Sequence, residues 1–388
     1  MAHYERLLGL TLPPGQSAFL WGPRKVGKST LLRAQFPDSA RFDLLDARLL
    51  LEFTRAPWRL GERLAALSPD VRARPVVIDE VQKVPALLDE VHRLIEEEGL
   101  SFVLCGSSAR KLKRGRGNLL GGRAWRFELH PLAWPEIPDF DLLRALGCGL
   151  VPQHYDSPGP RRALAGYVVD YLKEEVFDEG LTRNAAAFSR FFDALAFCHG
   201  ELINYSNIAR DCGIDAKTVR TYFEILADTL LGVRVEPFRR RRSRAVIVQA
   251  PKFYLFDVGV AGHVAGRRID RAAGAEFGRA LEHFILMELL AWRSYGGRDD
   301  PIRYWRTKSG LECDFVLGRR GEAVVEVKGT AALRNADLRP IRAYKEEHAP
   351  RRAIVVTAED APRKTADGIE LLPWRHFLER LWAGELLD

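Results

Sequence analysis

Short apolar segments alternate with amphipathic segments through the first third of the chain. Strands are predicted where the apolar runs are short, at 17–21, 40–45, 75–79, 101–105 and 124–129. Helices are predicted by apolar spacing from Lys28, around 58–67 and from Pro85 to Glu98. Strands that alternate with helices form a parallel sheet that is covered on both faces. The proline-rich segment 130–140 then predicts the end of an α/β domain that spans residues 1–140.

The pattern becomes helical over residues 141–265. Ser206 is predicted to cap a helix that ends near Cys212. Gly213 then makes a turn, and Asp215 caps a second helix. One buried helical face is predicted by the spacing of Ile208, Val219, Tyr222, Phe223 and Leu226. Two strands follow with a basic segment between them, an order that is typical of a helical linker and a winged helix-turn-helix.

Residues 266–388 return to α/β character, as a third predicted domain. A strongly apolar helix is predicted over 277–292. Extended segments are predicted at 303–310, 311–317 and 323–329. A further helix follows at 334–350, and a last strand at 351–358. A chain of 388 residues is long enough for three domains, since one domain takes about 150 residues.

Composition bears on partners and location. The net charge of +7 and the isoelectric point near 9.2 favour an anionic partner, with nucleic acid ahead of a membrane surface. Much of the basic excess is arginine, which a GC-rich genome also produces. The five cysteines match no metal spacing and indicate a reducing compartment. Since no signal-peptide pattern and no apolar run of about 18 residues occurs, we expect a cytoplasmic protein without a membrane partner.

The segment Gly22–Ser29 has the pattern G-x-x-x-x-G-K-S between a predicted strand and a predicted helix. In this context the glycines let backbone N–H groups point at phosphate oxygens, and the helix adds the positive end of its dipole. We expect Lys28 to reach the β- and γ-phosphates of ATP and Ser29 to bind Mg²⁺. The predicted nucleotide-binding residues are Gly22, Pro23, Arg24, Lys25, Val26, Gly27, Lys28, Ser29 and Thr30.

An acidic pair at the end of a later strand supports this interpretation. Asp79 is predicted to hold Mg²⁺ through water, and Glu80 is predicted to polarise the attacking water. The neighbouring strand ends in Ser107 and Ser108. Their hydroxyls either sense the γ-phosphate or cap the loop, and both interpretations stay open.

These motifs, together with "IDEVQKVPALLDEVHRLIE", "LCGSSARKL" and "LLGGRAWRFELHPLAWPE", resemble a family of AAA+-type bacterial and archaeal ATPases. Members carry an uncharacterised nuclease-like domain at the C-terminus, and the resemblance covers nearly the whole chain. It implies an additional-strand P-loop fold, in which another strand separates the Asp79 strand from the phosphate-loop strand. It also implies that Arg123 is an arginine finger, in cis or in trans, and that Gln82 links Glu80 to another site.

The predicted winged helix has residues that suit DNA. Its second helix offers four polar side chains to a groove: Lys217, Thr218, Arg220 and Thr221. The basic wing offers phosphate contacts with steep salt dependence, through Arg239, Arg240, Arg241, Arg242 and Arg244. A winged helix in an ATPase also serves as a packing module, so both interpretations remain open.

A third constellation lies near the C-terminus, in "LECDFVLGRRGEAVVEVKG". A strand delivers Asp314, while Glu326 and Lys328 are two residues apart and share a face of the next strand. Two carboxylates hold Mg²⁺ beside a scissile phosphate, and a lysine stabilises the developing charge. Asp314 and Glu326 are therefore predicted metal ligands, and Lys328 a catalytic residue. Glu282, on the apolar helix, completes the metal shell or positions the general base.

The order of a helix Glu, a strand Asp and then E-x-K resembles the restriction-endonuclease-like PD-(D/E)XK fold, with Cys313 where the motif has Pro. Asp314 and Glu326 share a face only if residues paired in the hairpin have numbers with an even sum. A three-residue loop, 318–320, meets this condition and sets Asp314 opposite Val324, whereas a four-residue loop needs a bulge. The nuclease hypothesis thus predicts an odd loop or a bulge.

Three functions fit these residues. The first is a Mg²⁺-dependent ATP hydrolase that acts on DNA or is regulated by it, with a metal-dependent nuclease site at the C-terminus. In the second, ATP controls a switch or scaffold, as a homo-oligomer or with a partner protein, and the nuclease-like domain binds without cutting. The third is an effector of a defence or toxin system whose cleavage is released by a trigger.

Overall fold

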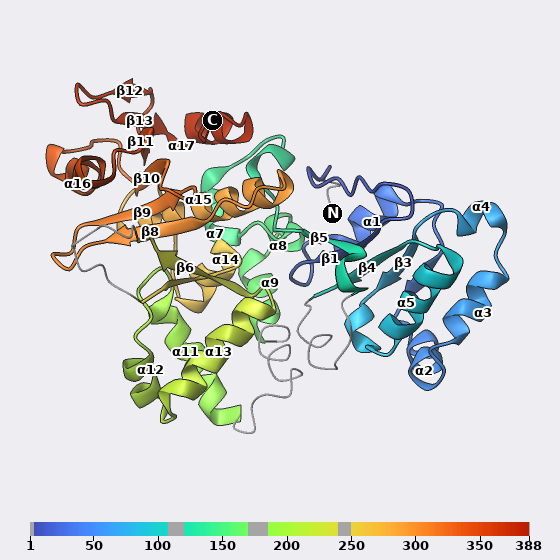
Figure 1. Ribbon diagram of the computed structural model, residues 1–388. Helices are drawn as coiled ribbons and strands as arrows, with labels where there is room; N and C mark the ends of the chain where they lie inside the picture. Colours follow the sequence, from blue (N-terminus) through green and yellow to red (C-terminus); the bar gives the residue numbers. More distant parts are fainter. Residues whose placement is uncertain (1–3, 108–119, 170–184, 240–249, 388) are drawn as a thin grey trace. The chain divides into compact units, whose positions relative to one another are not determined.

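The computed structural model describes residues 4–107, 120–169, 185–239 and 250–387. The chain divides into two compact units, whose elements are labelled in Figure 1. The smaller unit contains Glu5–His130 and Asp228–Leu231. The larger unit contains Met1–Tyr4, Pro131–Ala227 and Gly232–Asp388. The phosphate-loop motif therefore belongs to the smaller unit, and the E-x-K motif belongs to the larger one.

A five-stranded parallel sheet forms the centre of the smaller unit among the described residues. Its strands are β1 (Ser17–Trp21), β2 (Arg41–Asp43), β3 (Val76–Asp79), β4 (Phe102–Gly106) and β5 (Ala124–Glu128). Their order is β2-β3-β4-β1-β5, so β4 separates the Asp79 strand from the phosphate-loop strand, and the additional-strand prediction is confirmed. Strands β1, β3 and β4 are buried along their whole length, as expected when both faces of a parallel sheet are covered.

The helices of the smaller unit are α1 (Lys28–Gln35), α2 (Ala47–Arg55), α3 (Arg59–Ala65), α4 (Pro69–Arg72) and α5 (Leu87–Glu98), with 3₁₀ turns η1 (Val81–Lys83) and η2 (Leu120–Gly122). The helices predicted from Lys28, around 58–67 and up to Glu98 are confirmed. Apolar side chains of α2, α3 and α5 form one core with alternate residues of the strands, such as Phe19 and Ile78. Helix α2 was not predicted, although the Asp46 side chain caps it by accepting from two backbone N–H groups.

The helices of the larger unit before its sheet are η3 (Trp134–Glu136), α7 (Leu142–Cys148), α8 (Pro152–Tyr155), α9 (Pro160–Tyr167), α11 (Ala185–Cys198), α12 (Tyr205–Cys212) and α13 (Ala216–Asp228). The turn at Gly213, with φ of 65°, and the cap by Asp215 are confirmed. The predicted cap by Ser206 is wrong, because the helix is capped two residues earlier by Asn204, whose side chain accepts from the Asn207 N–H. The five apolar residues predicted for the inner face are all buried.

An eight-stranded mixed sheet dominates the larger unit within the described ranges. Its strands are β6 (Gly232–Pro237), β7 (Lys252–Leu255), β8 (Ile302–Arg306), β9 (Glu312–Leu317), β10 (Ala323–Lys328), β11 (Arg352–Thr357), β12 (Arg363–Lys364) and β13 (Glu370–Pro373). The order is β12-β13-β11-β10-β9-β8-β6-β7. Strand β6 pairs with β7 and, at Glu236 and Pro237, also with β8. The two regions that we divided at residue 265 therefore share one sheet.

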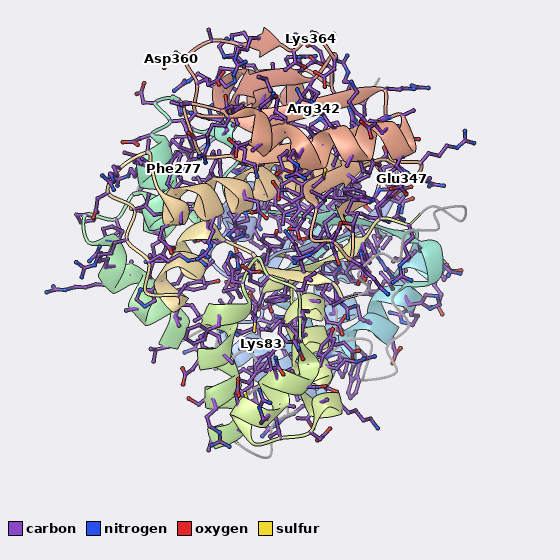
Figure 2. The ribbon with its side chains drawn as sticks, turned by 90° about the vertical axis from the view of Figure 1, so that its left-hand side faces the viewer. Lys83, Phe277, Arg342, Glu347, Asp360 and Lys364 are labelled. Atoms are coloured by element: carbon purple, nitrogen blue, oxygen red, sulfur yellow. The ribbon has the colours of Figure 1, made fainter. Side chains whose placement is uncertain are left out.

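Helices cover both faces of this sheet. The elements are α14 (Val258–Val264), α15 (Ala275–Tyr295), α16 (Arg339–His348), preceded by η5 (Asn335–Leu338), and α17 (Trp374–Trp382). Helices α15 and α17 pack on the face that carries Phe315 and Val325, and α16 packs on the face that carries Val316 and Val324. In Figure 2, Phe277 marks the start of α15, and Arg342 and Glu347 mark α16.

The hairpin of β9 and β10 meets the predicted register condition. Leu317 pairs with Ala323, and Phe315 with Val325, so every pair has the same even sum. The loop is odd, as predicted, but it spans residues 318–322. Neither the three-residue loop nor the four-residue loop that we considered forms, and Val324 pairs with Val316 instead of lying opposite Asp314.

Candidate functional site

Lys28 begins α1 and lies over the phosphate-binding loop. Its Nζ donates hydrogen bonds to the carbonyl oxygens of Gly22, at 2.8 Å, and Pro23, at 2.9 Å. A Cβ at Gly22 would lie 2.5 Å from the carbonyl oxygen of Leu129, and Gly27 has φ of 99°, so both positions require glycine. The loop thus has the tight turn that lets backbone N–H groups gather around a phosphate.

The other residues of the predicted nucleotide site follow the same loop and the first turn of α1. Val26 is buried, Arg24 and Lys25 are half-buried, and Thr30 is exposed. Lys25 has φ of 65°, a left-handed conformation that is uncommon outside glycine. Their contacts with a nucleotide stay predictions.

Ser29 and Asp79 meet at the carboxyl end of the sheet. The Ser29 hydroxyl donates to Asp79 Oδ2 at 2.5 Å, and Asp79 Oδ1 accepts from the Glu80 N–H at 3.0 Å. A hydroxyl and a carboxylate are the oxygen ligands that Mg²⁺ prefers. This pair would therefore hold the Mg²⁺ of bound ATP, where the ion compensates phosphate charge.

Glu80 has the backbone and the electrostatics of a functional residue. Its φ of 56° lies in the left-handed region, which is strained for a residue with a Cβ. Burial raises the pKa of Glu80, the charge of Lys28 opposes this shift, and the charge of Asp79 adds to it. A carboxylate whose basicity is raised in this way suits a general base.

Gln82 connects Glu80 to the neighbouring strand. Its Nε2 donates to Glu80 Oε2 at 2.5 Å and to Ser107 Oγ at 3.2 Å. Gln82 Oε1 is buried and has no hydrogen-bond partner among the described residues. The structure thus identifies Ser107 as the second residue of the predicted link, whereas Ser108 lies outside the described residues.

Arg123 lies away from the phosphate loop. It directly precedes β5, and Ala124 pairs in parallel with Ser17, the first residue of β1, while the loop follows the last residue of β1. Its guanidinium forms an ion pair with Glu96. The prediction of an arginine finger in cis is therefore wrong, because the two groups stand at opposite ends of parallel strands. A role in trans stays a prediction.

In the larger unit, Asp314, Glu326 and Lys328 come together at the point where β9 and β10 separate. Lys328 Nζ lies 2.6 Å from Glu326 Oε1. Asp314 Oδ2 accepts from the Val327 N–H at 2.7 Å, in place of a ladder partner. Glu326 Oε2 is buried and lacks a hydrogen-bond partner in the described part of the chain. Such an atom, beside a second carboxylate, fits a divalent cation.

A β-bulge aims Asp314 into this position. Arg303 pairs with Val316 and Trp305 pairs with Cys313, so two steps along β8 match three steps along β9. The additional residue lies at Asp314 or the next position. Bulges of this kind redirect a side chain and are common beside active sites. The odd loop that the nuclease hypothesis predicted is therefore present, whereas this bulge lies between β8 and β9 and not in the hairpin for which a bulge was the predicted alternative.

Glu282 on α15 reaches the same cluster, but it is already engaged. Its Oε1 accepts from the Tyr254 hydroxyl at 2.5 Å and lies 3.5 Å from Lys252 Nζ. Lys252 also forms an ion pair with Glu312. We name Glu282, Glu312, Asp314, Glu326, Lys252 and Lys328 the carboxylate cluster. Sequence reasoning missed Lys252, Tyr254 and Glu312; the available signal was a lysine and a tyrosine two residues apart on an otherwise apolar strand.

Burial dominates the electrostatics of the carboxylate cluster. Burial, and then the charges of Glu326 and Glu282, raise the pKa of Asp314. Burial raises the pKa of Glu326 to about 7, although Lys328 opposes the shift. Burial alone would lower the pKa of Lys252, but the surrounding acidic groups raise it. Over the described ranges, no three or more His, Cys, Asp and Glu side chains form a ready metal site, so a cation would depend on the pair Asp314 and Glu326.

The residues predicted to contact DNA are only partly described. Lys217 and Arg220 are exposed on α13, and Arg220 lies over the ring of Tyr205 at 5.0 Å. Both line a pocket of about 800 Å³. The hydroxyl groups of Thr218 and Thr221 are engaged within the helix. Arg239 is exposed, and Arg240, Arg241, Arg242 and Arg244 lie outside the described residues.

Three family models match the chain in series. Residues 15–138 match an AAA domain, so the smaller unit contains an AAA-type ATPase domain. Residues 140–271 match a domain of unknown function (DUF8612), and residues 277–377 match a second one (DUF4143). The resemblance to AAA-type ATPases is thereby confirmed for the first third of the chain.

Curated relatives include two uncharacterized mycobacterial proteins, Rv2008c of Mycobacterium tuberculosis and Mb2031c of Mycobacterium bovis. Each is 27% identical over 326 residues, which are 80% of this chain and 70% of the relative. Among solved structures, a signal transduction ATPase with numerous domains from Pyrococcus horikoshii, which has a tetratricopeptide repeat sensor, matches at 13% identity. Its TM-score is 0.21, and the match covers 72% of this chain and 45% of that one. Within the described residues, no helix is long and apolar enough to cross a membrane.

Proposed function

We propose that the protein is a Mg²⁺-dependent ATP hydrolase that acts on DNA or is regulated by it, and that its larger unit cuts nucleic acid with a divalent cation. The observation that carries the second part is Glu326 Oε2, which lies beside Asp314 without a hydrogen-bond partner among the described residues, with Lys328 on the other oxygen of Glu326. The first part rests on the AAA domain and on the contact between Ser29 and Asp79.

In ATP hydrolysis, each residue of the smaller unit has a role that its contacts support. Lys28 exchanges the carbonyl oxygens of Gly22 and Pro23 for phosphate oxygens, which are stronger acceptors because they are charged. Glu80 orients the attacking water and accepts its proton. Ser107, joined to Glu80 through Gln82, contacts the γ-phosphate.

In nucleic acid cleavage, Asp314 and Glu326 would hold the cation, which polarises the scissile phosphate. Lys328 stabilises charge on the phosphate or orients the attacking water. Both carboxyl groups are buried, so their ionised form is costly unless a cation compensates it.

DNA would reach the protein through α12, α13, β6 and β7, acting as a winged helix. Lys217 and Arg220 are exposed on the second helix, where a recognition helix carries its contacts. The basic segment between β6 and β7, which begins at Arg239, would contact phosphates. Binding would then weaken steeply with salt.

One panel tests this proposal: ATPase and nuclease rates of the wild type, Lys28→Ala, Lys328→Ala and Asp314→Ala, with and without DNA, in Mg²⁺ and Mn²⁺. Lys28→Ala is expected to abolish ATPase activity. Asp314→Ala and Lys328→Ala are expected to abolish cleavage and to keep the ATPase rate. A wild type that cuts neither DNA nor RNA in any form with either metal refutes the nuclease part.

A switch or scaffold is the second candidate, and one observation favours it. The carboxylate cluster carries two lysines of its own, and Arg306 pairs with Glu312, so three cations face its four carboxylates within the fold. A domain that binds DNA or a partner protein without cutting needs no more than this. A change of oligomeric state on ATP addition that is indifferent to DNA, measured by light scattering, would favour this candidate.

A further inference from the structure

Lys252 is a cation built into the carboxylate cluster. It stands at the start of β7, and 4% of its side chain is exposed. Its Nζ forms an ion pair with Glu312 and lies 3.5 Å from Glu282 Oε1. The ring of Tyr304 lies 5.8 Å from the same nitrogen. A lysine buried to this degree is retained only where its charge is compensated, and here two carboxylates compensate it.

Glu282 is engaged with this lysine and with Tyr254. The oxygen that faces Lys252 also accepts the Tyr254 hydroxyl at 2.5 Å. To ligate a metal through this oxygen, Glu282 would have to give up the hydrogen bond from Tyr254 and the contact with Lys252. Breaking a buried ion pair on one side is costly, because it leaves an uncompensated charge.

Asp314 and Glu326, like Glu282, each have one oxygen that is engaged. Lys328 takes one oxygen of Glu326 and the Val327 N–H takes one oxygen of Asp314. The second oxygen of Glu326 is buried and without a hydrogen-bond partner among the described residues. Within the described residues, Glu326 therefore has one buried oxygen that is not satisfied, whereas the Glu282 oxygen that faces Lys252 is satisfied.

We infer that the cluster takes a single divalent cation, at Asp314 and Glu326, and that Lys252, held by Glu282 and Glu312, is a permanent second cation. This inference rests on the proposed nuclease site and makes it more specific. Lys252 and Glu282 are then positioning residues that fix the charge beside the metal. The ligand class is one hard divalent ion with oxygen ligands, and Glu282 lies outside its ligand set.

The test is a Mn²⁺ titration of the full-length, nucleotide-free protein by calorimetry, with free Mn²⁺ followed by electron paramagnetic resonance. The number of ions at the cluster is the number of Mn²⁺ ions bound by the wild type minus the number bound by Asp314→Asn. This subtraction removes any ion at the phosphate loop, because both proteins have that loop. The expected difference is one. Glu282→Gln is expected to keep the Mn²⁺ affinity within about threefold of wild type, since Glu282 is not a ligand and the amide still accepts the Tyr254 hydroxyl.

Lys252 is tested by a matched pair of variants. Lys252→Met leaves Glu282 without its cation and Glu312 with Arg306 alone, and it is expected to raise the difference to two ions. Lys252→Arg keeps the charge and is expected to leave it at one. Thermal melting identifies a variant that does not fold, and Glu282→Gln decides the question if Lys252→Met is such a variant.

Three outcomes overturn the inference. A difference of two ions in the wild type, or a loss of affinity of tenfold or more in Glu282→Gln, overturns the single-cation assignment and leaves the proposed nuclease site standing. A difference of zero overturns the proposed metal site and the inference together.

Discussion

Replacing Gln82 by alanine tests how the smaller unit positions its catalytic carboxylate. The substitution removes the amide that donates to Glu80 Oε2 at 2.5 Å and to Ser107 Oγ at 3.2 Å. It also removes Gln82 Oε1, a buried acceptor that lacks a hydrogen-bond partner among the described residues. Because that unsatisfied atom is lost as well, we expect the fold to tolerate the substitution.

The size of the effect follows from the contact with Glu80. A hydrogen bond to a charged group contributes about 1.5–3 kcal/mol. Each 1.36 kcal/mol changes a rate tenfold, so kcat is expected to fall by about 10- to 100-fold. Burial already raises the pKa of Glu80, and the Gln82 amide opposes that shift. Its loss raises the pKa further, and the acid limb of the kcat profile therefore moves to higher pH.

The assay is steady-state phosphate release at saturating ATP and Mg²⁺ between pH 5 and 9 (about two units on either side of neutrality). Gln16→Ala is the matched control. The Gln16 amide donates to the carbonyl oxygens of Ser17 and Arg123, at the amino end of the same sheet. This control is expected to keep the wild-type rate and the wild-type profile. KM for ATP is expected to change less than threefold in either variant.

Ser107→Ala completes a double-mutant cycle with Gln82→Ala. If the three residues act as one relay, the two substitutions are non-additive by about 0.5–3 kcal/mol. Additive effects together with an unmoved acid limb would show that Gln82 acts only through packing, and the relay would then be refuted.

Three further expectations follow from the contacts. A Cβ at Gly329 would lie 2.7 Å from the Cα of Gly278, so Gly329→Ala is expected to push α15 away from β10. This variant should destabilise the protein by about 1–3 kcal/mol and weaken Mn²⁺ binding. The control is Gly278→Ala, whose Cβ meets nothing within 4 Å, and equal urea midpoints for the two variants would contradict this expectation. Burial raises the pKa of Glu288 from 4.5 to about 8, although hydrogen bonds from Trp134 and Trp382 lower it. Between these two pKa values, the folded protein keeps a proton on Glu288 that the unfolded chain releases. Stability is therefore expected to fall as pH rises from about 5 to 8 in thermal melts, and Glu288→Gln should flatten that dependence. Conversely, burial lowers the pKa of His283 from 6.5 to about 3, so below pH 6.5 this histidine binds a proton in the unfolded chain but not in the folded protein. Stability should therefore also fall with acidification. A melting temperature of Glu288→Gln that increases when the pH is lowered from 6.5 to 4 would contradict this.

Much of the smaller unit could be predicted from the sequence, because its signals are local. Five apolar runs separated by helical spacing imply a parallel sheet, and G-x-x-x-x-G-K-S after the first strand locates the phosphate loop. Asp79 and Glu80 were recognised because they end an apolar strand, and parallel strands present their carboxyl ends at one edge. Glycine at 22 and 27 is a backbone requirement that is visible in the motif itself.

The failures concern contacts between residues distant in sequence. Arg123 was assigned to the nucleotide from its motif, but strand direction puts it at the far end of β1. For the hairpin, loops of three and four residues were considered, whereas Gly318 and Gly321, both with positive φ, lie in a loop of 318–322. Ser206 was assigned a cap that Asn204 provides, since both residue types suit that position.

For the second site, the sequence by itself determined the residue types: a hairpin with an aspartate, a glutamate and a lysine at nuclease spacing, and a glutamate on an apolar helix. Only the tertiary structure decided what these groups do to one another. A bulge on β9 aims Asp314, and the pairing of β6 with β8 brings β7 into the sheet, with Lys252 at the carboxylate cluster. The physical reason is that charge compensation in a buried site depends on distances of a few ångströms between strands that are far apart in the chain, and no spacing along the sequence encodes those distances.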